Sequence, residues 1–324
     1  MATTLRAPFP WFGGKGRLAG VVWDRLGDVS SYVEPFAGSA AVLLARPDSH
    51  QWWDRLETIN DLDGFVANFW RAVQHDPEQV AHYADWPVNE NDLHARHIWL
   101  VGQQASLAPM LEGDPEWYDA RIAGWWVWGI CAWIGSGWCS GEGPWVVDGG
   151  LLVKGDAGQG INRQMPHLGN DAGHCEAWSD HLVGTMQRLA DRLRRVRVCS
   201  GDWSRVCTPV VVQASRRGPY GVFLDPPYSH IGRDTDLYNH ESATVAEEVR
   251  EWAVANGDNP EYRIALCGFS GEHDMPSDWT PQWWRRGGGF GSQSGRAKRR
   301  DEVVWFSPAC LAGADVVQAA LVAD

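Results

Sequence analysis

The fold is decided by the stretch SYVEPFAGSAAVLL, residues 31–44. Its first part reads as a short strand, and its second part, from Ala37, as a glycine turn that feeds a helix. A second strand is predicted to end at Asp61, followed by a helix whose apolar residues recur at spacings of three and four from Phe65 to Val73. Because an acidic residue ending the second strand commonly binds ribose hydroxyls, the stretch predicts an α/β fold with a nucleotide-type site.

Strands and helices alternate again in the last part of the chain. The sequence predicts helices at 182–193 and 245–255, strands at 196–199 and 263–267, and a strand that ends just before Asp225. The final pair, around 289–293 and 302–307, is typical of an antiparallel hairpin. The expected fold class is therefore α/β, with a mostly parallel sheet and a C-terminal antiparallel hairpin.

Residues 84–178 show no clear strand alternation, and Gly, Trp and Pro dominate there. We interpret them as an inserted target-recognition region that interrupts a catalytic domain formed by residues 1–83 and 179–324. Trp125 and Trp128 lie at a helical spacing that a buried face explains. Exposed tryptophans near Trp138 or Trp145 are candidates for stacking on bases or wedging into a duplex.

The bulk composition predicts a soluble globular protein. With 324 residues, 44% of them hydrophobic and 21% charged, the chain can bury one large core plus an inserted subdomain. Seven scattered cysteines without a Cys-x-x-Cys pair indicate neither a disulfide framework nor a metal site. A reducing, cytoplasmic location fits this pattern, and the N-terminus lacks the pattern of a signal peptide.

One uncharged stretch, residues 122–141, is long enough to span a bilayer. Its second half is rich in glycine and serine, and tryptophan prefers membrane interfaces to the hydrocarbon centre. We therefore expect no membrane span.

The net charge of −13 argues against a nucleic-acid partner, because phosphate contacts normally demand a basic footprint. The distribution of charge matters more than its sum. A basic run follows a glycine-rich segment and resembles a flexible loop that tracks phosphates: Arg296, Lys298, Arg299 and Arg300. A solvated surface face is the alternative interpretation of such a run.

The tetrapeptide Asp225-Pro226-Pro227-Tyr228 indicates methylation of an exocyclic amine. A carboxylate and a backbone carbonyl held rigid by prolines can both accept hydrogen bonds from a planar NH₂ group, which favours a pyramidal nitrogen at the moment of transfer. The tyrosine ring offers a flat face for an extruded base. On its own, the tetrapeptide is also typical of a turn at a strand end.

Two other glycine signals carry less weight. The segment Gly13-Gly14-Lys15 does not have the spacing of a phosphate loop, and no hydroxyl residue follows the lysine. No Gly-x-Gly-x-x-Gly follows a predicted strand, so a nicotinamide or flavin enzyme is not indicated.

Taken in order, four motifs resemble those of the Dam-like, class D12 adenine-N6 DNA methyltransferases: WFGGK at 11–15, EPFAGS at 34–39, Asn60-Asp61, and the tetrapeptide at 225–228. The resemblance extends to residues 268–270 and 295–305 and is vague from 84 to 178. It implies a Rossmann-like methyltransferase fold, S-adenosylmethionine as methyl donor, no metal, and base flipping from double-stranded DNA. The motif order is similar to the α arrangement of amino-methyltransferases.

The resemblance also implies roles for single residues. Trp11 and Lys15 would line the donor pocket, with Lys15 near the donor's polar end. Further donor contacts would come from the loop Glu34, Phe36 and Gly38, from Asp61 at the ribose, from Asp202 near the adenine, and from Asp225. Asp225 and the carbonyl of Pro226, in a backbone held by Pro227, would bind the target amine while Tyr228 stacks on the base.

The resemblance leaves the target sequence open, because residues 133–145 lack the Asn- and Arg-containing turn of better-known members. Asp rather than Ser at position 225 favours adenine over cytosine-N4, and no Pro-Cys pair is present for cytosine-C5 chemistry. RNA or protein-amide methylation, and an inactive DNA-binding relative, remain the alternatives. We expect a monomer or weak dimer. A restriction-modification partner, a maintenance methylase and a viral defence all fit the motifs.

Overall fold

The computed structural model describes residues 5–11, 13–48, 54–133, 137–139, 145–148, 151–154, 166, 178–227, 244–284 and 302–312. Its centre is a seven-stranded sheet. In spatial order, the strands are β5 (Val196–Ser200), β2 (Leu56–Asp61), β1 (Ser31–Glu34), β6 (Tyr220–Leu224), β7 (Tyr262–Phe269), β9 (Glu302–Phe306) and β8 (Thr280–Trp284). The first five run parallel, whereas β9 is antiparallel to both β7 and β8.

Both faces of the sheet are buried, which explains the nearly continuous apolar runs of its central strands. In β6, Val222 and Leu224 point to one core, and Phe223 points to the other. The same alternation divides β9, where Val303 and Val304 enter different cores. Each of these two strands therefore contributes to two hydrophobic layers.

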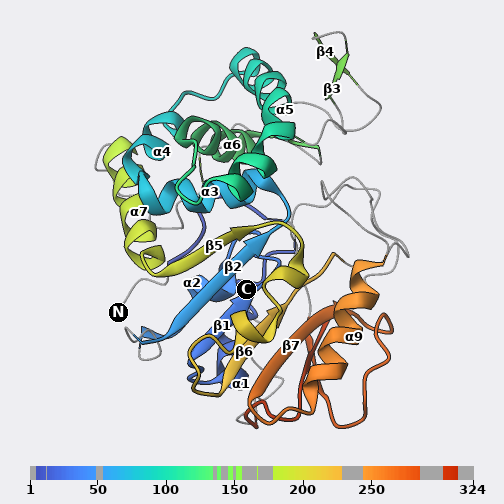
Figure 1. Cartoon of the computed structure of the whole chain (residues 1–324). Coiled ribbons are helices and arrows are strands. Elements are labelled where there is room, and N and C mark those ends of the chain that lie inside the picture. The colour runs from blue at the N-terminus through green and yellow to red at the C-terminus, as the bar shows by residue number, and fades with distance from the viewer. Residues whose placement is uncertain are drawn as a thin grey trace, which may run out of the picture.

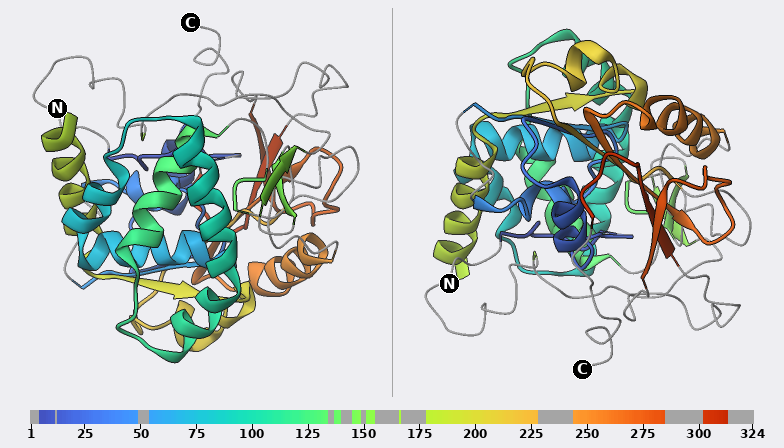
Figure 2. Two further views of the ribbon diagram at one scale, coloured as in Figure 1. Left: turned by 90° about the horizontal axis from the view of Figure 1, so that it is seen from above. Right: turned by 90° about the horizontal axis from the view of Figure 1, so that it is seen from below.

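Helices cover both faces (Figures 1 and 2). The larger core joins one face to α1 (Ala19–Leu26), α2 (Ala41–Leu44), α3 (Gly64–His75), α4 (Pro77–Ala84), α5 (Glu90–Gly113), α6 (Ala120–Ala132) and α7 (Trp178–Leu193). The smaller core joins the other face to the short helix η3 (Trp203–Arg205), α8 (Pro209–Val212) and α9 (Val245–Gly257). The result is a three-layer α/β architecture, as the sequence predicted.

The prediction of a C-terminal antiparallel hairpin is confirmed, but one of its two strands was predicted at the wrong residues. Strand β9 begins at Glu302 as predicted, but its hairpin partner is β8, Thr280–Trp284. Residues 289–293, the predicted partner, lie outside the described residues. Strand β8 escaped prediction because it contains Pro281 and buries only Trp284, as an edge strand can.

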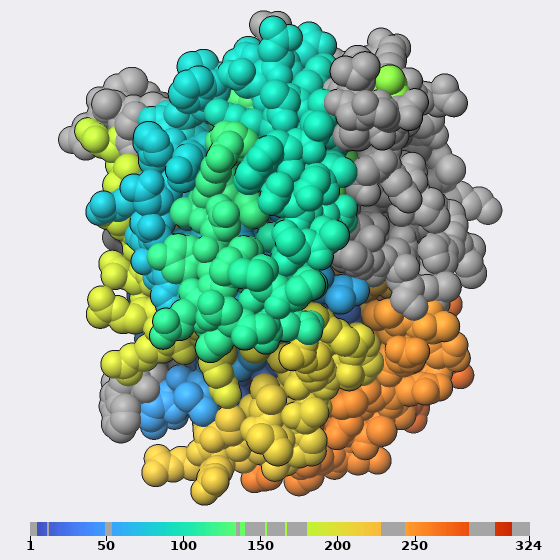
Figure 3. All heavy atoms as spheres, turned by 45° about the horizontal axis from the view of Figure 1, so that its top comes forward, coloured from blue at the N-terminus to red at the C-terminus, as the bar shows by residue number. Residues whose placement is uncertain are grey.

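The first half of the predicted recognition region is helical. Helix α5 has 24 residues and α6 has 13, and both pack into the larger core together with α3, α4 and α7. In Figure 3, α5, in teal, covers a broad part of the molecular surface turned toward the viewer. Strands β3 (Trp145–Asp148) and β4 (Leu151–Lys154) form a separate antiparallel pair. The domain boundary at residue 84 stays a prediction.

The tryptophans of this region divide between core and surface. Trp128 is fully buried, as its helical spacing predicted, and Trp125 is half-buried. The expectation of an exposed Trp138 is wrong: the ring is buried, and its Nε1 donates to the carbonyl of Trp126 at 3.1 Å. Among the described residues, no helix combines the length and hydrophobicity that a bilayer crossing needs.

Candidate functional site

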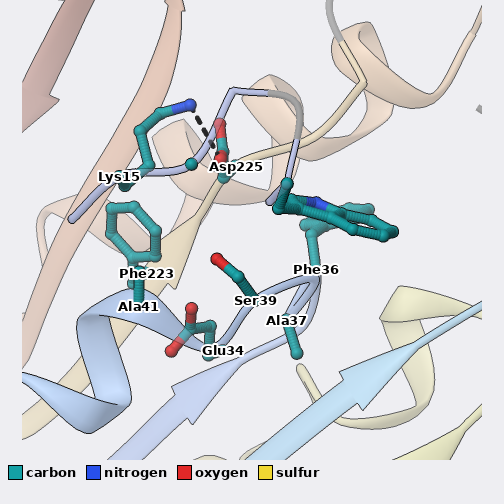
Figure 4. Close-up of a pocket in the computed structure, with 10 residues that line it drawn as sticks. Lys15, Glu34, Phe36, Ala37, Ser39, Ala41, Phe223 and Asp225 are labelled. Carbon is teal, nitrogen blue, oxygen red and sulfur yellow. Dashed lines mark ion pairs between the residues drawn. The ribbon is translucent and has the colours of Figure 1, made fainter. Parts of the chain in front are cut away.

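The order of the strands indicates where on the sheet a ligand would bind. Sequential connections run outward from β1 to β2 and β5 on one side, and from β6 to β7 on the other, so the order reverses between β1 and β6. In open α/β sheets, ligands bind beyond the carboxyl ends of the strands at such a switch point. A pocket lies at this place, lined by Trp11, Gly14, Lys15, Glu34, Phe36, Ala37, Ser39, Ala41, Phe223 and Asp225 (Figure 4).

The loop after β1 depends on a glycine. Gly38 has a φ of +45°, and a Cβ built on it would lie 2.2 Å from Nε1 of Trp11. The Trp11 ring therefore packs directly against the backbone of the loop, and a side chain at position 38 would displace the ring. The Gly38 carbonyl accepts a hydrogen bond from Nε1 of Trp70 at 2.8 Å, which holds the loop from α3.

The end of β2 is tied to the same loop. Oδ2 of Asp61 accepts from the Gly38 N–H at 2.8 Å, and Oδ1 accepts from the Asp63 N–H at 3.0 Å. Burial, with a contribution from Asp63, raises the pKa of Asp61 to about 7. Beside it, the Asn60 side chain donates to the carbonyls of Pro35 and Gly201, joining the carboxyl ends of three strands.

A buried charge cluster forms the other side of the pocket. Nζ of Lys15 lies 2.8 Å from Oδ2 of Asp225 (Figure 4). It also lies 3.9 Å from Oε2 of Glu302 and donates to the Gly13 carbonyl at 2.8 Å. Lys15 and Glu302 are 4% and 2% exposed. Burial alone would lower the pKa of Lys15, but the nearby Asp225, Cys267 and Glu302 raise it overall, so Lys15 is a cation.

Glu34 is the second buried carboxyl group of the pocket. Its Oε2 accepts from the Tyr32 hydroxyl at 2.9 Å and from the Leu43 N–H at 3.1 Å. Burial raises the pKa of Glu34 to about 8, with Asp225 and Glu57 as further causes. At neutral pH the group is therefore mostly a neutral acid that can also donate a hydrogen bond.

An aromatic surface adjoins the pocket. The ring of Phe36 stacks on Trp203 with centroids 6.3 Å apart and an interplanar angle of 27°. Asp202, the residue before Trp203, is exposed, and its carboxylate caps η3 by accepting from the Ser204 N–H at 2.9 Å. Asp202 is not among the residues that line the pocket.

The structure brings most of the predicted site residues together. Trp11, Lys15, Glu34, Phe36 and Asp225 line one pocket, and Gly38 and Asp61 form its edge by the contacts above.

Other predicted residues are less completely defined. Pro226 is buried and Pro227 half-buried after β6. Five predicted residues lie outside the described part of the chain: Tyr228, Arg296, Lys298, Arg299 and Arg300. Their roles stay predictions.

Two site residues were missed at the level of sequence. Ser39 lines the pocket next to the loop glycine, and Glu302 approaches Lys15 from β9. A signal for Glu302 was present, because it is the one charged residue of the strand EVVWF, in which every residue is buried. A fully buried carboxylate requires a charged or hydrogen-bonding partner.

The arrangement suits a ligand with a cationic and a sugar-bearing part. The cluster of Lys15, Asp225 and Glu302 holds two carboxylates and one ammonium, so its net charge favours a cation. The Asp61 carboxylate accepts from the backbone N–H groups of Gly38, Leu62 and Asp63, and its two oxygens can accept a further hydrogen bond from a hydroxyl group. In the described ranges, no three His, Cys, Asp or Glu side chains gather as metal ligands would.

A comparison with family models gives one match. Residues 11–96 match the D12 class N6 adenine-specific DNA methyltransferases, so a domain of this class is found there. The match covers Trp11, the Gly38 loop and Asp61, and it confirms the resemblance that the motifs indicated. No curated protein matches the chain at a significant level.

Proposed function

We propose, from the premise that residues 11–96 carry a D12-class domain, that the chain transfers a methyl group from S-adenosylmethionine to N6 of adenine in double-stranded DNA after base flipping. One observation carries the proposal: Asp225, which directly follows β6, lies in the same pocket as the loop after β1, and its Oδ2 is 2.8 Å from Nζ of Lys15. Donor-binding and amine-binding motifs far apart in the sequence thus share one site.

The residues of the pocket fit the donor. Trp11, which packs against Gly38, would line the donor site together with the loop after β1, and the Asp61 carboxylate would accept from ribose hydroxyls. Phe36 and the ring stacked on it provide an apolar surface for the donor's adenine. The net negative charge near Lys15 favours a sulfonium, which when bound supplies an already activated methyl group.

The protein's part in the reaction is to position the amine. The carboxylate of Asp225 and the carbonyl of Pro226 would accept hydrogen bonds from the target NH₂ and favour a pyramidal nitrogen. The N6 lone pair then forms the new N–C bond, the electrons of the C–S bond remain on sulfur, and the amine releases one proton to water. Tyr228 would stack on the flipped base, and the basic residues 296–300 would contact phosphates.

The test is tritiated methyl transfer from S-adenosylmethionine to unmethylated duplex DNA. The wild-type chain is expected to label DNA. Asp225→Ala is expected to abolish labelling while only weakening donor binding, because the carboxylate acts on the amine. The matched control is Asp258→Ala, an exposed carboxylate at the end of α9, which should label DNA at the wild-type rate.

Two results would contradict the proposal. The first is normal donor binding with no labelling of duplex DNA by the wild-type chain. The second is wild-type turnover by Asp225→Ala, which would refute the role of the carboxylate.

A further inference from the structure

We propose that Glu302 is a positioning residue that governs the Lys15 ammonium and, through it, the availability of Asp225 for the target amine. The inference rests on the proposed function, because it assigns Asp225 to the amine. It concerns a residue on the C-terminal strand β9, outside the segment that matches the family model.

Asp225 is already paired with the Lys15 ammonium. Its Oδ2 lies 2.8 Å from the Lys15 ammonium, a strong charge-assisted contact. An oxygen already bound to an ammonium is a weaker acceptor for another N–H group. For Asp225 to bind the target amine at full strength, the ammonium must shift part of its interaction to another group.

Glu302 provides that second group. Its Oε2 lies 3.9 Å from Nζ of Lys15, which is within ion-pair range and beyond hydrogen-bond range. A shift of the ammonium by about 1 Å toward β9 would exchange one carboxylate for the other. Because the ammonium is buried, losing the contact with Asp225 would take away its nearest negative charge, which is costly unless another carboxylate approaches.

The surroundings of Glu302 hold it in place. It pairs with Phe269 of β7 in the sheet, and its cross-strand neighbour on β8 is Trp284. The Trp284 ring lies 6.0 Å from Nζ of Lys15, so β8 and β9 together form a wall beside the ammonium. The backbone of Glu302 is thus held by pairing on both sides, whereas the Lys15 ammonium is carried on a side chain with four rotatable bonds.

The key variant is Glu302→Gln, which keeps the shape and removes the charge. We expect single-turnover methyl transfer at saturating donor to fall by about 10- to 100-fold, beyond any loss of donor affinity from the removed charge, because the effect is on positioning. Glu302→Asp keeps the charge and should recover part of the rate. Glu251→Gln removes a carboxylate that is 67% exposed on α9 and should leave the rate unchanged.

A double-variant cycle separates positioning from a merely structural role. If Glu302 acts through Lys15, then Lys15→Met combined with Glu302→Gln should be no slower than Lys15→Met alone. Independent, multiplying effects would overturn the inference, as would wild-type turnover by Glu302→Gln in a chain that labels DNA.

A measurement without DNA keeps this inference distinct from the proposed function. In NMR spectra of Lys15 recorded at neutral pH, Glu302→Gln should shift the resonances of the ε-methylene and of Nζ relative to the wild type, since a negative charge 3.9 Å from Nζ is removed. Unchanged resonances would overturn the link between Glu302 and Lys15. Failure of the wild type to label DNA, with the expected change in the spectrum, would instead count against the proposed function.

Discussion

Two clusters of buried charges lie at opposite ends of the same sheet. At the amino ends of the strands, both oxygens of Glu57 accept from the Arg192 guanidinium at 2.7 Å, and Oε1 also accepts from Arg46 at 3.1 Å. At the carboxyl ends, Lys15 lies between Asp225 and Glu302. The first cluster joins two arginines to Glu57, with the half-exposed Asp28 3.9 Å from Arg46, whereas the second has more carboxylates than lysines among the described residues.

The difference distinguishes buried charges that stabilise the fold from buried charges that border the pocket. The guanidiniums around Glu57 also donate to backbone carbonyls, Arg46 to Val29 and Arg192 to Leu43, which fastens α2 and α7 to the sheet. None of these side chains lines the pocket. The Lys15 cluster opens onto the pocket and carries excess negative charge, which a cationic ligand can balance. We therefore expect the first cluster to govern folding and the second to govern chemistry.

The largest effect on stability is expected from Glu57→Gln. It removes the carboxylate that binds both guanidiniums, and the Arg46 side chain is 0% exposed, so the free energy of unfolding should fall by about 3–5 kcal/mol. Denaturant unfolding measures this. Glu112→Gln breaks an ion pair of 2.9 Å between groups that are 54% and 46% exposed and should change the free energy by less than about 1 kcal/mol. Equal losses in both variants would mean that burial does not distinguish the clusters.

A smaller effect, dependent on pH, is expected from Glu34→Gln. The folded-state pKa of about 8 lies above the ordinary 4.5, so the folded wild type retains a proton that the unfolded chain loses. The stability this proton gives is complete below pH 4.5 and is lost as pH rises to about 8. The neutral amide lacks this dependence, so the melting temperature of Glu34→Gln relative to the wild type should rise between pH 5 and 8. A constant difference would show that Glu34 is ionised in the folded state.

Gly38→Ala tests the geometry at the carboxyl ends. The new Cβ would lie 2.2 Å from Trp11, at a φ of +45°, so the variant should lose about 1–2 kcal/mol of stability and bind the donor more weakly. The control is Gly20→Ala in α1, where no atom lies within 4 Å of the added Cβ. Calorimetric donor binding to both variants provides the measurement. Unchanged affinity in Gly38→Ala would remove the loop from the donor site.

The smallest effect is expected at Asp61. With a pKa of about 7, the carboxylate is mostly ionised at pH 8 and mostly protonated at pH 6. If only the ionised form binds the ribose, donor affinity should fall by about tenfold when the pH is lowered from 8 to 6. Asp61→Asn should bind weakly at both pH values. An affinity independent of pH in the wild type would contradict the role of Asp61 in donor binding.

How far the sequence could predict the structure depends on the range of the interactions involved. The unit at residues 31–44 could be predicted because its strand, glycine turn and helix are local patterns. Helix α5 was missed, although Leu93, Leu100 and Leu107 recur at helical spacing, because the polar Arg96 and His97 occupy buried positions between them. Stacking on tryptophans permits this burial, with Arg96 4.2 Å from the Trp128 ring centroid and His97 stacked on Trp133. Because these stacking partners are distant in the sequence, no local sequence pattern indicates that Arg96 and His97 are buried in a helix.

The candidate site shows the same limit. Lys15 and Asp225 were predicted separately from motifs, but their 2.8 Å contact requires the first loop to meet the end of β6 in space. Glu302 carried only the weak signal of a charge in an apolar strand. Its proximity to Lys15 follows from the antiparallel pairing of β9 with β7, which the local sequence of neither strand specifies.

The most direct test of the central claim is to identify the methylated nucleoside after tritium transfer to duplex DNA, comparing the wild type with Asp225→Asn and Glu57→Gln at equal concentrations of folded protein. The account predicts label in N6-methyldeoxyadenosine for the wild type and Glu57→Gln. For Asp225→Asn, it predicts a loss of about 10²-fold or more, the scale of removing one group that stabilises the transition state. Label in another nucleoside, or full transfer by Asp225→Asn, would contradict it.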